Sequence, residues 1–282
     1  MIKKYLKKID IIYSLVLFFR EFKILSKDVM FKNALGFKFK GEVGMENGSF
    51  ECKELKIFNS VINFSDLFVN AGSNVGYFVC HALNKGLDVI AFEPNHLNHQ
   101  VLMQNVVANN WQKKTTIYPL ALSDEVSINK IYGGGTGASL IKGWANQDKS
   151  VIVPINKLDN FKTQIQKYVQ PFIFIDIEGN EYNCLIGSQE ILNFKKKPIW
   201  FIEICFDQHQ PNYRKYNPHF LDTFELFNQY GYSCYMISEK IECIDIARIK
   251  NIMKTKINDL DSHNFLFIDS KNKTLLKQLF KN

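Results

Sequence analysis

One stretch of the sequence, residues 66–94, constrains the fold class more than any other. Two short apolar runs, Leu67–Ala71 and Asp88–Phe92, predict strands, and the turn Gly72–Gly76 between them opens a helix. This order of strand, glycine turn, helix and strand is one half-turn of a doubly wound α/β sheet. Because such sheets bind ligands at the carboxyl ends of their strands, we expect a site there.

The residues around the glycine turn are suited to a nucleoside. Gly72 and Gly76 have no Cβ where a ligand must approach the backbone and where φ can be positive, and the helix start offers unpaired N–H groups. Glu93 follows Gly72 by 21 residues, at the end of the next strand, where a carboxylate can accept both hydrogen bonds of a ribose diol. The alternative is a tight turn with a solvated glutamate.

The glycine pattern separates one class of nucleoside from another. A dinucleotide fingerprint has a third glycine, whereas Gly72, Asn74 and Gly76 are followed here by Tyr77 and Phe78. A P-loop needs Lys-Ser or Lys-Thr after its last glycine, and this turn has neither. S-adenosylmethionine has no phosphate, so backbone groups, one Asn amide and an acid for the ribose suit it better.

Six segments in a fixed order are more specific than any one of them. They are FVNAGSNVGYF, IAFEPNHLNHQVLMQNVVANN, LALSDE, VIVPINKLD, FIDIEGNEYNCLIG and NFLFI. From about Val61 to Asp269 the chain resembles the FkbM family of S-adenosylmethionine-dependent methyltransferases. The resemblance implies a Rossmann-like class I fold with a doubly wound seven-stranded sheet, and transfer of a methyl group from S-adenosylmethionine to an oxygen.

The resemblance also implies a substrate class, either sugars of surface glycans or polyketides and other secondary metabolites. We expect a sugar hydroxyl, in polysaccharide biosynthesis. A secondary metabolite as acceptor stays an alternative, as does a non-catalytic nucleoside-binding module that has kept the fold. The missing third glycine disfavours a nicotinamide oxidoreductase.

A second apolar run ends in acidic residues. Pro171–Ile175 predicts a central strand buried on both faces, so Asp176 lies at its carboxyl end, beside the glycine turn and the cofactor. Asp176 and Glu178 can both face the cleft, and Gly179 lets the backbone enter a helix expected over Glu181–Asn193. Two carboxylates here suit an acceptor hydroxyl first, as orienting group or general base, and a metal ion second. Capping of the helix is the alternative.

Four further residues complete the predicted site. Asn70 ends the first strand, where the family usually has aspartate, and can hydrogen-bond the methionine moiety without pairing as a charge. The resemblance puts Asp124, beside Ser123, near the adenine amino group, an exposed turn being the alternative. His209 is a candidate base in a loop at the same edge, or a solvated histidine. The predicted cofactor-binding residues are thus Asn70, Gly72, Asn74, Gly76, Glu93, Ser123, Asp124 and Asp176, and the predicted catalytic residues are Asp176, Glu178 and His209.

Two features bear on the acceptor. Where the family usually carries a lysine two residues before the aspartate, this chain has Phe174. The run Gly133–Gly137 holds four glycines in five residues and predicts either a linker or a mobile lid that carries Ser139 and Trp144 toward an acceptor pocket.

Cysteine spacing bears on metal chemistry and compartment. The six cysteines include no C-x-x-C pair, so neither a zinc site nor a redox motif is indicated, and we predict no metal. Cys80, Cys184 and Cys205 lie in apolar runs and are expected in the core. With 46% hydrophobic and 22% charged residues, a globular protein of the reducing cytoplasm is the simplest expectation.

The net charge of +7 belongs to an N-terminal arm, because residues 1–40 hold ten Lys or Arg against three acidic residues. Apolar residues recur at helical spacing over residues 2–17, without a cleavage site and short of the roughly 18 needed to span a bilayer. This favours a helix that caps the domain or a partner over one on a membrane surface. Without an RNA or DNA module, lysines do not indicate nucleic acid.

We expect two parts in the chain. Residues 1–60 form the basic helix and a small hairpin region over Phe31–Ser60, and residues 61–282 form the methyltransferase domain, with an insertion over about 238–262. Further helices are expected over Asn98–Asn110, Phe161–Val169 and Phe220–Tyr230, and further strands over Thr115–Pro119, Val126–Tyr132, Val151–Pro154, Pro198–Ile204, Ser233–Ile237 and Phe265–Asp269.

Overall fold

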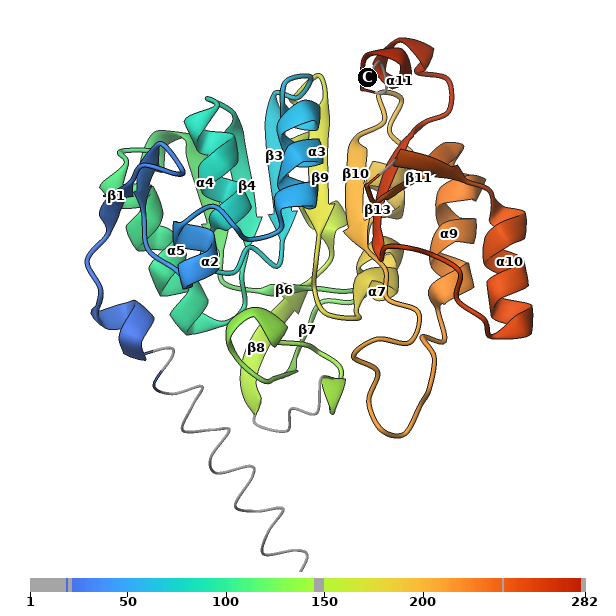
Figure 1. The fold of residues 1–282 in the computed structure, drawn as a ribbon, viewed down its shortest axis with the longest axis horizontal. Coiled ribbons are helices and arrows are strands. Elements are labelled where there is room, and N and C mark those ends of the chain that lie inside the picture. Colours follow the sequence, from blue (N-terminus) through green and yellow to red (C-terminus); the bar gives the residue numbers. More distant parts are fainter. Residues whose placement is uncertain (1–18, 20–21, 145–149, 240, 280–282) are drawn as a thin grey trace, which may run out of the picture.

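An eight-stranded sheet forms the centre of the computed structural model, which describes residues 19, 22–144, 150–239 and 241–279 (Figure 1). Its strand order is β12-β11-β13-β10-β9-β3-β4-β5. The strands are β3 (Leu67–Ala71), β4 (Asp88–Phe92), β5 (Thr115–Tyr118), β9 (Pro171–Ile175), β10 (Ile199–Glu203), β11 (Tyr232–Ile237), β12 (Ile241–Ile244) and β13 (Asn264–Asp269). The expected doubly wound sheet of seven strands is confirmed, and β12, from the insertion, adds an eighth at one edge.

The direction of the strands places one edge of the sheet where ligands bind in this fold class. Strands β10, β9, β3, β4 and β5 pair in parallel, whereas β13 runs antiparallel to β10 and to β11. The carboxyl ends of β3, β4 and β9 therefore meet at one edge, as the sequence predicted.

Two hydrophobic cores lie on the two faces of the sheet. Side chains alternate between them along each strand, so that Phe68 and Phe172 belong to one core and Val69 and Ile173 to the other. On the first face lie α3 (Cys52–Ile62), α4 (Tyr77–Asn84), α5 (His96–Ala108) and α11 (Lys273–Leu279). On the second lie η4 (Leu158–Phe161), α6 (Lys162–Ile165), α7 (Glu181–Ile186), α8 (Gln189–Leu192), α9 (Phe220–Gln229) and α10 (Ile246–Thr255).

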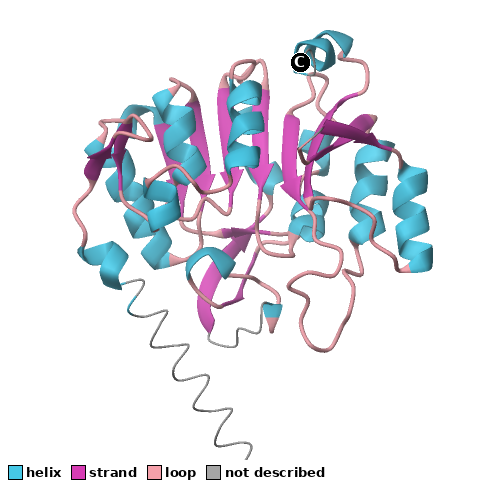
Figure 2. Ribbon diagram, in the orientation of Figure 1, coloured by secondary structure: helices cyan, strands magenta, loops and turns pink. Residues whose placement is uncertain are grey.

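A three-stranded sheet lies beyond the carboxyl ends of the central strands (Figure 2). It has the order β6-β8-β7, formed by β6 (Ala121–Leu122), β8 (Ser150–Asn156) and β7 (Ser127–Tyr132). Its small core includes Ile131 and Val153. The short turns η1 (Gln112–Lys114) and η2 (Gly135–Gly137) complete this part of the chain.

Several expected helices have other bounds in the structure. The single helix predicted over Glu181–Asn193 is divided into α7 and α8, and the helix predicted over Phe161–Val169 ends at Ile165. Gly187 and Ser188 separate α7 from α8. Tertiary packing can override the local helix preference of such segments.

The segment before the main sheet is only partly a hairpin. Strands β1 (Met30–Lys32) and β2 (Phe37–Phe39) form the expected hairpin, but α2 (Val43–Glu46) and α3 follow it as helices. The boundary expected after residue 60 falls within α3, whose Phe58 and Val61 are buried in the core. Hairpin alternation and helical spacing are hard to separate over such short runs.

The predicted N-terminal helix lies almost entirely outside the described residues, since residues 1–18 and 20–21 are not described, and it stays a prediction. Ile24 and Leu25, just after it, pack against the core. Within the described ranges, the helices are all too short or too polar to cross a membrane.

Candidate functional site

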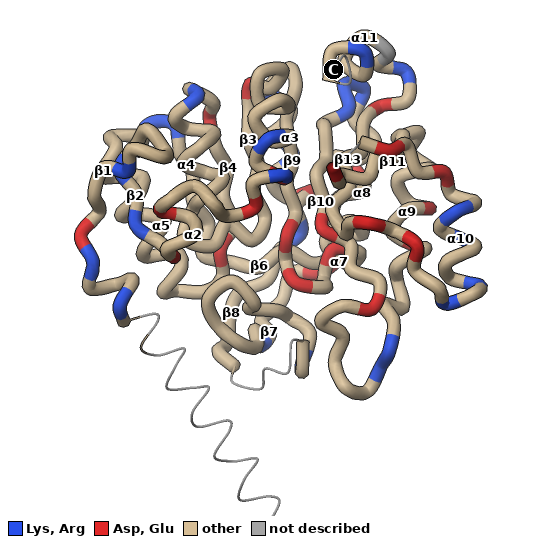
Figure 3. The backbone as a smooth tube through the Cα atoms, in the orientation of Figure 1, with Lys and Arg blue, Asp and Glu red and all other residues tan. Residues whose placement is uncertain are grey.

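A cavity of about 260 Å³ opens at the carboxyl ends of β3, β4 and β9. Five carboxylates line it, and none of its described lining residues is Lys or Arg; the acids are Glu51, Glu93, Asp176, Glu178 and Glu203. Figure 3 shows acidic residues gathered around α7 and the ends of β9 and β10. The cavity is therefore suited to a ligand with positive charge.

The glycine turn has the backbone conformation that the sequence predicted. Gly72 has φ +78° and Gly76 has φ +88°, values that favour glycine. A Cβ on Gly72 would overlap the carbonyl oxygen of Asp176, and one on Gly76 would overlap the side chain of Leu102. From the sequence, glycine is expected at these positions because a ligand approaches the backbone. In the structure, close packing against other residues of the protein requires glycine there. Gly72 lines the cavity, whereas Gly76 is absent from its lining and begins α4.

Glu93 is buried at the end of β4 and binds the turn directly. Its Oε2 accepts a hydrogen bond from the Asn74 N–H at 2.6 Å, and its Oε1 accepts one from the Asn95 N–H at 2.8 Å. Burial raises the pKa of Glu93 to about 7, against the effect of these hydrogen bonds. The carboxylate therefore has a structural role that the sequence did not reveal, and it keeps further lone pairs for a ligand.

Asn70 and Phe174 lie side by side in the floor of the cavity. Both are buried, and Asn70 Nδ2 lies 3.5 Å from the carbonyl oxygens of Ala71 and Phe174, at the limit of hydrogen bonding. The Phe174 ring packs edge-on against Phe78 and Phe201, with centroid distances of 4.8 and 4.7 Å. The position where the family usually has lysine is thus part of an aromatic cluster.

Asp176 lies at the end of β9, as predicted, against a second carboxyl group. Burial raises the pKa of Asp176 well above its usual value, and the charge of Glu203 raises it further. Burial also raises the pKa of Glu203 to about 7, while its hydrogen bond with Asp176 acts in the opposite direction. The two groups can share one proton, as like charges in close contact do not both ionise.

Glu178 is held by three residues from distant parts of the chain. The indole Nε1 of Trp144 donates to Glu178 Oε2 at 2.6 Å, and the Ser139 hydroxyl donates to the Glu178 carbonyl at 2.6 Å. His209 Nδ1 lies 3.8 Å from the same Oε2. Burial, and then the charge of Asp176, raise the pKa of Glu178 to about 7, although the Trp144 hydrogen bond opposes them. The structure thus brings together all three predicted catalytic residues.

The backbone at Glu178 and Gly179 is fixed by this packing. Glu178 has φ +57°, which is uncommon for a residue with a side chain, and Gly179 has φ +96°. A Cβ on Gly179 would overlap the ring of Trp144. Glycine is therefore required where the indole covers the turn, and Trp144 is buried in that place.

The alternative role for Asp176 and Glu178, capping of the next helix, is wrong. Asn180 begins α7 without a side-chain cap. The carboxylate that accepts turn N–H groups is Glu181, from Gly179 at 2.9 Å and from Ile177 at 3.3 Å. Asp176 and Glu178 are thus free of this structural task.

The structure does not bring Ser123 and Asp124 into the cavity lining. Ser123 is buried and bonds Asp124 Oδ1 at 3.0 Å, while Asp124 is exposed. The preceding Ala121–Leu122 joins the second sheet through β8, and this pairing leads the chain away from the edge of β5. Leu120, Ala121 and Leu122 line the cavity, and Ser123 accepts a hydrogen bond from the lining residue Asn180 at 3.3 Å. The place of Ser123 and Asp124 beside adenine stays a prediction.

Two lining carboxylates were missing from the predicted site. Glu203 ends β10, and the rule that identified Asp176 at the end of a buried strand would have found it. Glu51 precedes α3 with φ +45°, and burial raises its pKa to about 8. No local motif marks Glu51, because only the packing of α3 brings it to the cavity.

The comparison with family models decides the assignment. Residues 70–234, more than half of the chain, match the Methyltransferase FkbM domain. The chain belongs to the FkbM methyltransferase family. No curated protein matches the sequence.

Solved structures similar to this FkbM methyltransferase include three bacterial methyltransferases. Methyltransferase FkbM from Methylobacillus flagellatus has a TM-score of 0.42 and 17% identity, over 72% of this chain and 44% of that chain. Precorrin-6y C5,15-methyltransferase from Geobacter metallireducens has a TM-score of 0.39 and 8% identity, over 86% of this chain and 97% of that chain. A SAM-dependent O-methyltransferase from Thermotoga maritima has a TM-score of 0.35 and 8% identity, over 77% of this chain and 64% of that chain. The chain thus spans under half of the first relative, and the family match and strand order carry the assignment.

Proposed function

We propose that this FkbM methyltransferase uses S-adenosylmethionine to methylate a hydroxyl group of a sugar, in the synthesis of a surface glycan. The observation that carries this proposal is the cavity at the ends of β3, β4 and β9, whose lining includes groups suited to a nucleoside and, from the end of β9, the carboxylates of Asp176 and Glu178. We call these two parts of the lining the cofactor wall (Asn70, Gly72, Asn74 and Glu93) and the acceptor wall (Asp176, Glu178 and His209).

The cofactor wall fits S-adenosylmethionine in both hydrogen bonding and charge. Glu93 keeps lone pairs for the ribose hydroxyls beyond its two backbone bonds, and Asn70 offers an amide to the methionine moiety. The sulfonium and ammonium groups of this molecule are cationic, and they suit a cavity lined by five carboxylates without Lys or Arg among the described residues. Apolar Leu120 and Leu122 suit the adenine ring.

When bound, S-adenosylmethionine supplies a methyl group on a positively charged sulfur. The acceptor wall then has two tasks, to hold a hydroxyl in line with that methyl group and to remove the hydroxyl proton. Glu178, with its pKa raised to about 7, is suited to accept the proton near neutral pH. Trp144 fixes the Glu178 carboxylate, and His209 lies beside it.

The lining of the cavity supports a neutral acceptor such as a sugar. Phosphorylated acceptors are usually bound by Arg or Lys, and the described lining has neither. Phe174 and Phe78 contribute apolar surface to the lining, and the acids offer acceptors for the hydroxyls of a sugar. The buried Trp144 is a candidate lid that opens for entry of the acceptor.

Titration of S-adenosylhomocysteine and of NAD into the purified protein, by calorimetry and thermal shift, tests the proposal. Binding of S-adenosylhomocysteine alone is expected. Binding of neither compound would favour a non-catalytic module that has kept the fold, and binding of NAD alone would favour an oxidoreductase. Transfer of labelled methyl groups to neutral sugars, but not to phosphorylated sugars, is the expected acceptor profile.

A further inference from the structure

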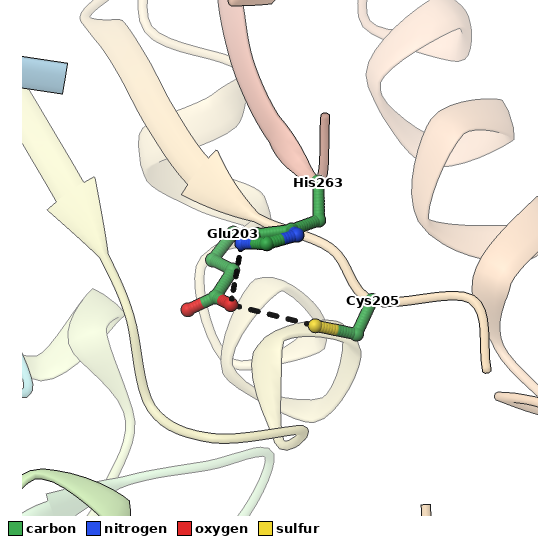
Figure 4. A group of neighbouring side chains, drawn as sticks. All are labelled: Glu203, Cys205 and His263. Atoms are coloured by element: carbon green, nitrogen blue, oxygen red, sulfur yellow. Dashed lines mark hydrogen bonds and ion pairs between the residues drawn. The ribbon is translucent and has the colours of Figure 1, made fainter. Parts of the chain in front are cut away.

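Three side chains with metal-ligand atoms meet beside the cavity, outside the proposed catalytic set. They come from the end of β10 and the start of β13 and are Glu203, Cys205 and His263. Figure 4 shows the carboxylate, the thiol and the imidazole pointing toward one another. Cys205 Sγ lies 3.4 Å and His263 Nε2 lies 3.3 Å from Glu203 Oε1, and the ligand atoms all lie within 4.8 Å of one another.

These distances fit one tetrahedral ion. With metal–ligand bonds of 2.0 to 2.3 Å, the edges of a tetrahedral zinc site are about 3.3 to 3.8 Å long. Two of the three edges already have that length, and the third is no longer than 4.8 Å. The His263 side chain is 43% exposed. That exposure also gives an ion a path to the otherwise buried Cys205.

The backbone holds the three ligands in place without the ion. Glu203 and Asn264 are partners in the β10–β13 pair, and the Ile204 N–H donates to the His263 carbonyl at 2.7 Å. Glu203 and Cys205 are two residues apart in extended chain, so their side chains lie on the same face. Glu203 is the last residue of β10, and Cys205 and His263 lie within two residues of the paired strands β10 and β13, which limits how far the three ligands can move apart.

The charges and atom types favour one class of ion. A carboxylate, a thiolate and a neutral imidazole carry two negative charges, which a divalent cation balances, and the thiol proton leaves to solvent on binding. Mixed N, S and O ligands suit zinc, whereas magnesium and calcium prefer oxygen alone. Three protein ligands leave one position open, as in catalytic zinc sites. Since Glu203 lines the cavity, that site borders the acceptor wall.

We propose that Glu203, Cys205 and His263 bind a zinc-class divalent ion at the border of the acceptor wall. The sequence predicted no zinc site because the cysteine and the histidine are 58 residues apart and only the β10–β13 pair joins them. The competing explanation is a trio joined by hydrogen bonds alone, with Cys205 and His263 both bonded to Glu203.

Cobalt binding to the full chain tests this proposal without any methyl-transfer assay. After treatment with a chelator, Co²⁺ is expected to bind at one ion per chain, with a thiolate-to-cobalt charge-transfer band that added Zn²⁺ abolishes. Cys205→Ser should remove the band, and His263→Ala, at a half-exposed position that folding tolerates, should weaken binding at least about tenfold. Cys243→Ser, at an exposed thiol, is the matched control and should leave the band unchanged.

Two results would overturn the metal site. Absence of the band in the folded wild-type protein would leave only the hydrogen-bonded trio. A band that survives both Cys205→Ser and His263→Ala but disappears with Cys243→Ser would assign the ion to an adventitious surface thiol.

Discussion

The cofactor wall and the acceptor wall differ in how their carboxylates are partnered. On the cofactor wall, Glu93 accepts two backbone N–H groups from residues close to it in the fold. On the acceptor wall, Asp176 contacts the like charge of Glu203, and Glu178 depends on Trp144, which reaches it from 34 residues away. The Glu93 carboxylate is thus held by backbone N–H groups, whereas the acceptor wall depends on side chains from separate segments.

The difference shows which parts of a site tolerate change. Because backbone N–H groups already hold Glu93 on the cofactor wall, substitution there acts first on ligand affinity and on local folding. Burial raises the pKa of carboxyl groups on both walls, but Asp176 and Glu178 also lie beside other acidic groups that raise their pKa further, as is typical of catalytic positions. We therefore expect rate effects from the acceptor wall and binding effects from the cofactor wall.

The largest expected effect is on the rate, from Asp176→Asn. This variant keeps the side-chain size and a hydrogen bond to Glu203, but it removes a carboxylate that orients or deprotonates the acceptor. Turnover per folded molecule should fall about 10² to 10⁴-fold while S-adenosylhomocysteine affinity stays nearly unchanged. Asp207→Asn, at an exposed position, is the control and should not alter the rate. A lower melting temperature with an unchanged rate would contradict the catalytic role.

The next effect is on stability, from Gly72→Ala, where the two walls touch. Gly36→Ala is a matched control, because both glycines have φ +78° but a Cβ on Gly36 meets no atom within 4 Å. Gly36→Ala should cost about 1 to 2 kcal/mol of unfolding free energy. Gly72→Ala should cost about 1 to 3 kcal/mol more, because its Cβ overlaps the Asp176 backbone. Equal losses in denaturant titrations would show that the walls are not in close contact.

A comparable effect on affinity is expected from Glu93→Ala. S-adenosylhomocysteine binding should weaken by about 1.5 to 3 kcal/mol, the range for a hydrogen bond to a charged group, as measured by calorimetry. Glu93→Gln keeps one acceptor oxygen for the turn and should lose less. Asp124→Ala tests the predicted adenine contact and should weaken binding less than Glu93→Ala, because Asp124 is exposed. Unchanged affinity in Glu93→Ala would move the ribose contact to another residue.

The smallest effect is a decline in melting temperature of a few degrees as pH rises from 6.5 to 8. Burial raises the pKa of Glu178 to about 7 and of Glu51 to about 8, so the folded protein loses protons in this window, while the unfolded chain has already lost them. The contribution of these two protonated carboxyl groups to the free energy of unfolding is fully present below pH 4.5, and it is lost as the pH rises through their pKa values of about 7 and 8. His81, with its pKa lowered to about 4, acts in the opposite direction only below pH 6.5.

Glu51→Gln sharpens this test. The variant has no carboxyl group to ionise there and should show a smaller decline between pH 7 and 8 than the wild type. A melting temperature that rises through this window would show that the carboxyl groups are not buried together.

The same contrast explains what could be predicted from sequence. Contiguous patterns predict the strands as buried apolar runs. The glycine turn, Glu93 and Asp176 could also be predicted, because each directly follows the end of such a run. The pairing of β6 with β8, which sets the position of the chain just before Ser123, had no signal in the sequence. Glu51 could not be found, because nothing in its local sequence reports the distant packing that buries it.

The roles of glycine show a second limit of sequence reasoning. Gly72, Gly76 and Gly179 have the positive φ that a turn at the site requires, and the first two were identified for that property. What excludes a Cβ is in each case a protein group, from Asp176, Leu102 or Trp144. A glycine pattern therefore predicts the backbone conformation, but only the fold reveals which neighbour makes glycine necessary.

A crystal structure of the protein with S-adenosylhomocysteine tests the division of the cavity most directly. We expect the ribose hydroxyls on the Glu93 carboxylate, the homocysteine moiety beside Asn70, and the sulfur directed toward Asp176 and Glu178. A ligand bound elsewhere, or one whose ribose lies against Asp176 while Glu93 keeps only its bonds to Asn74 and Asn95, would contradict the assignment of the two walls.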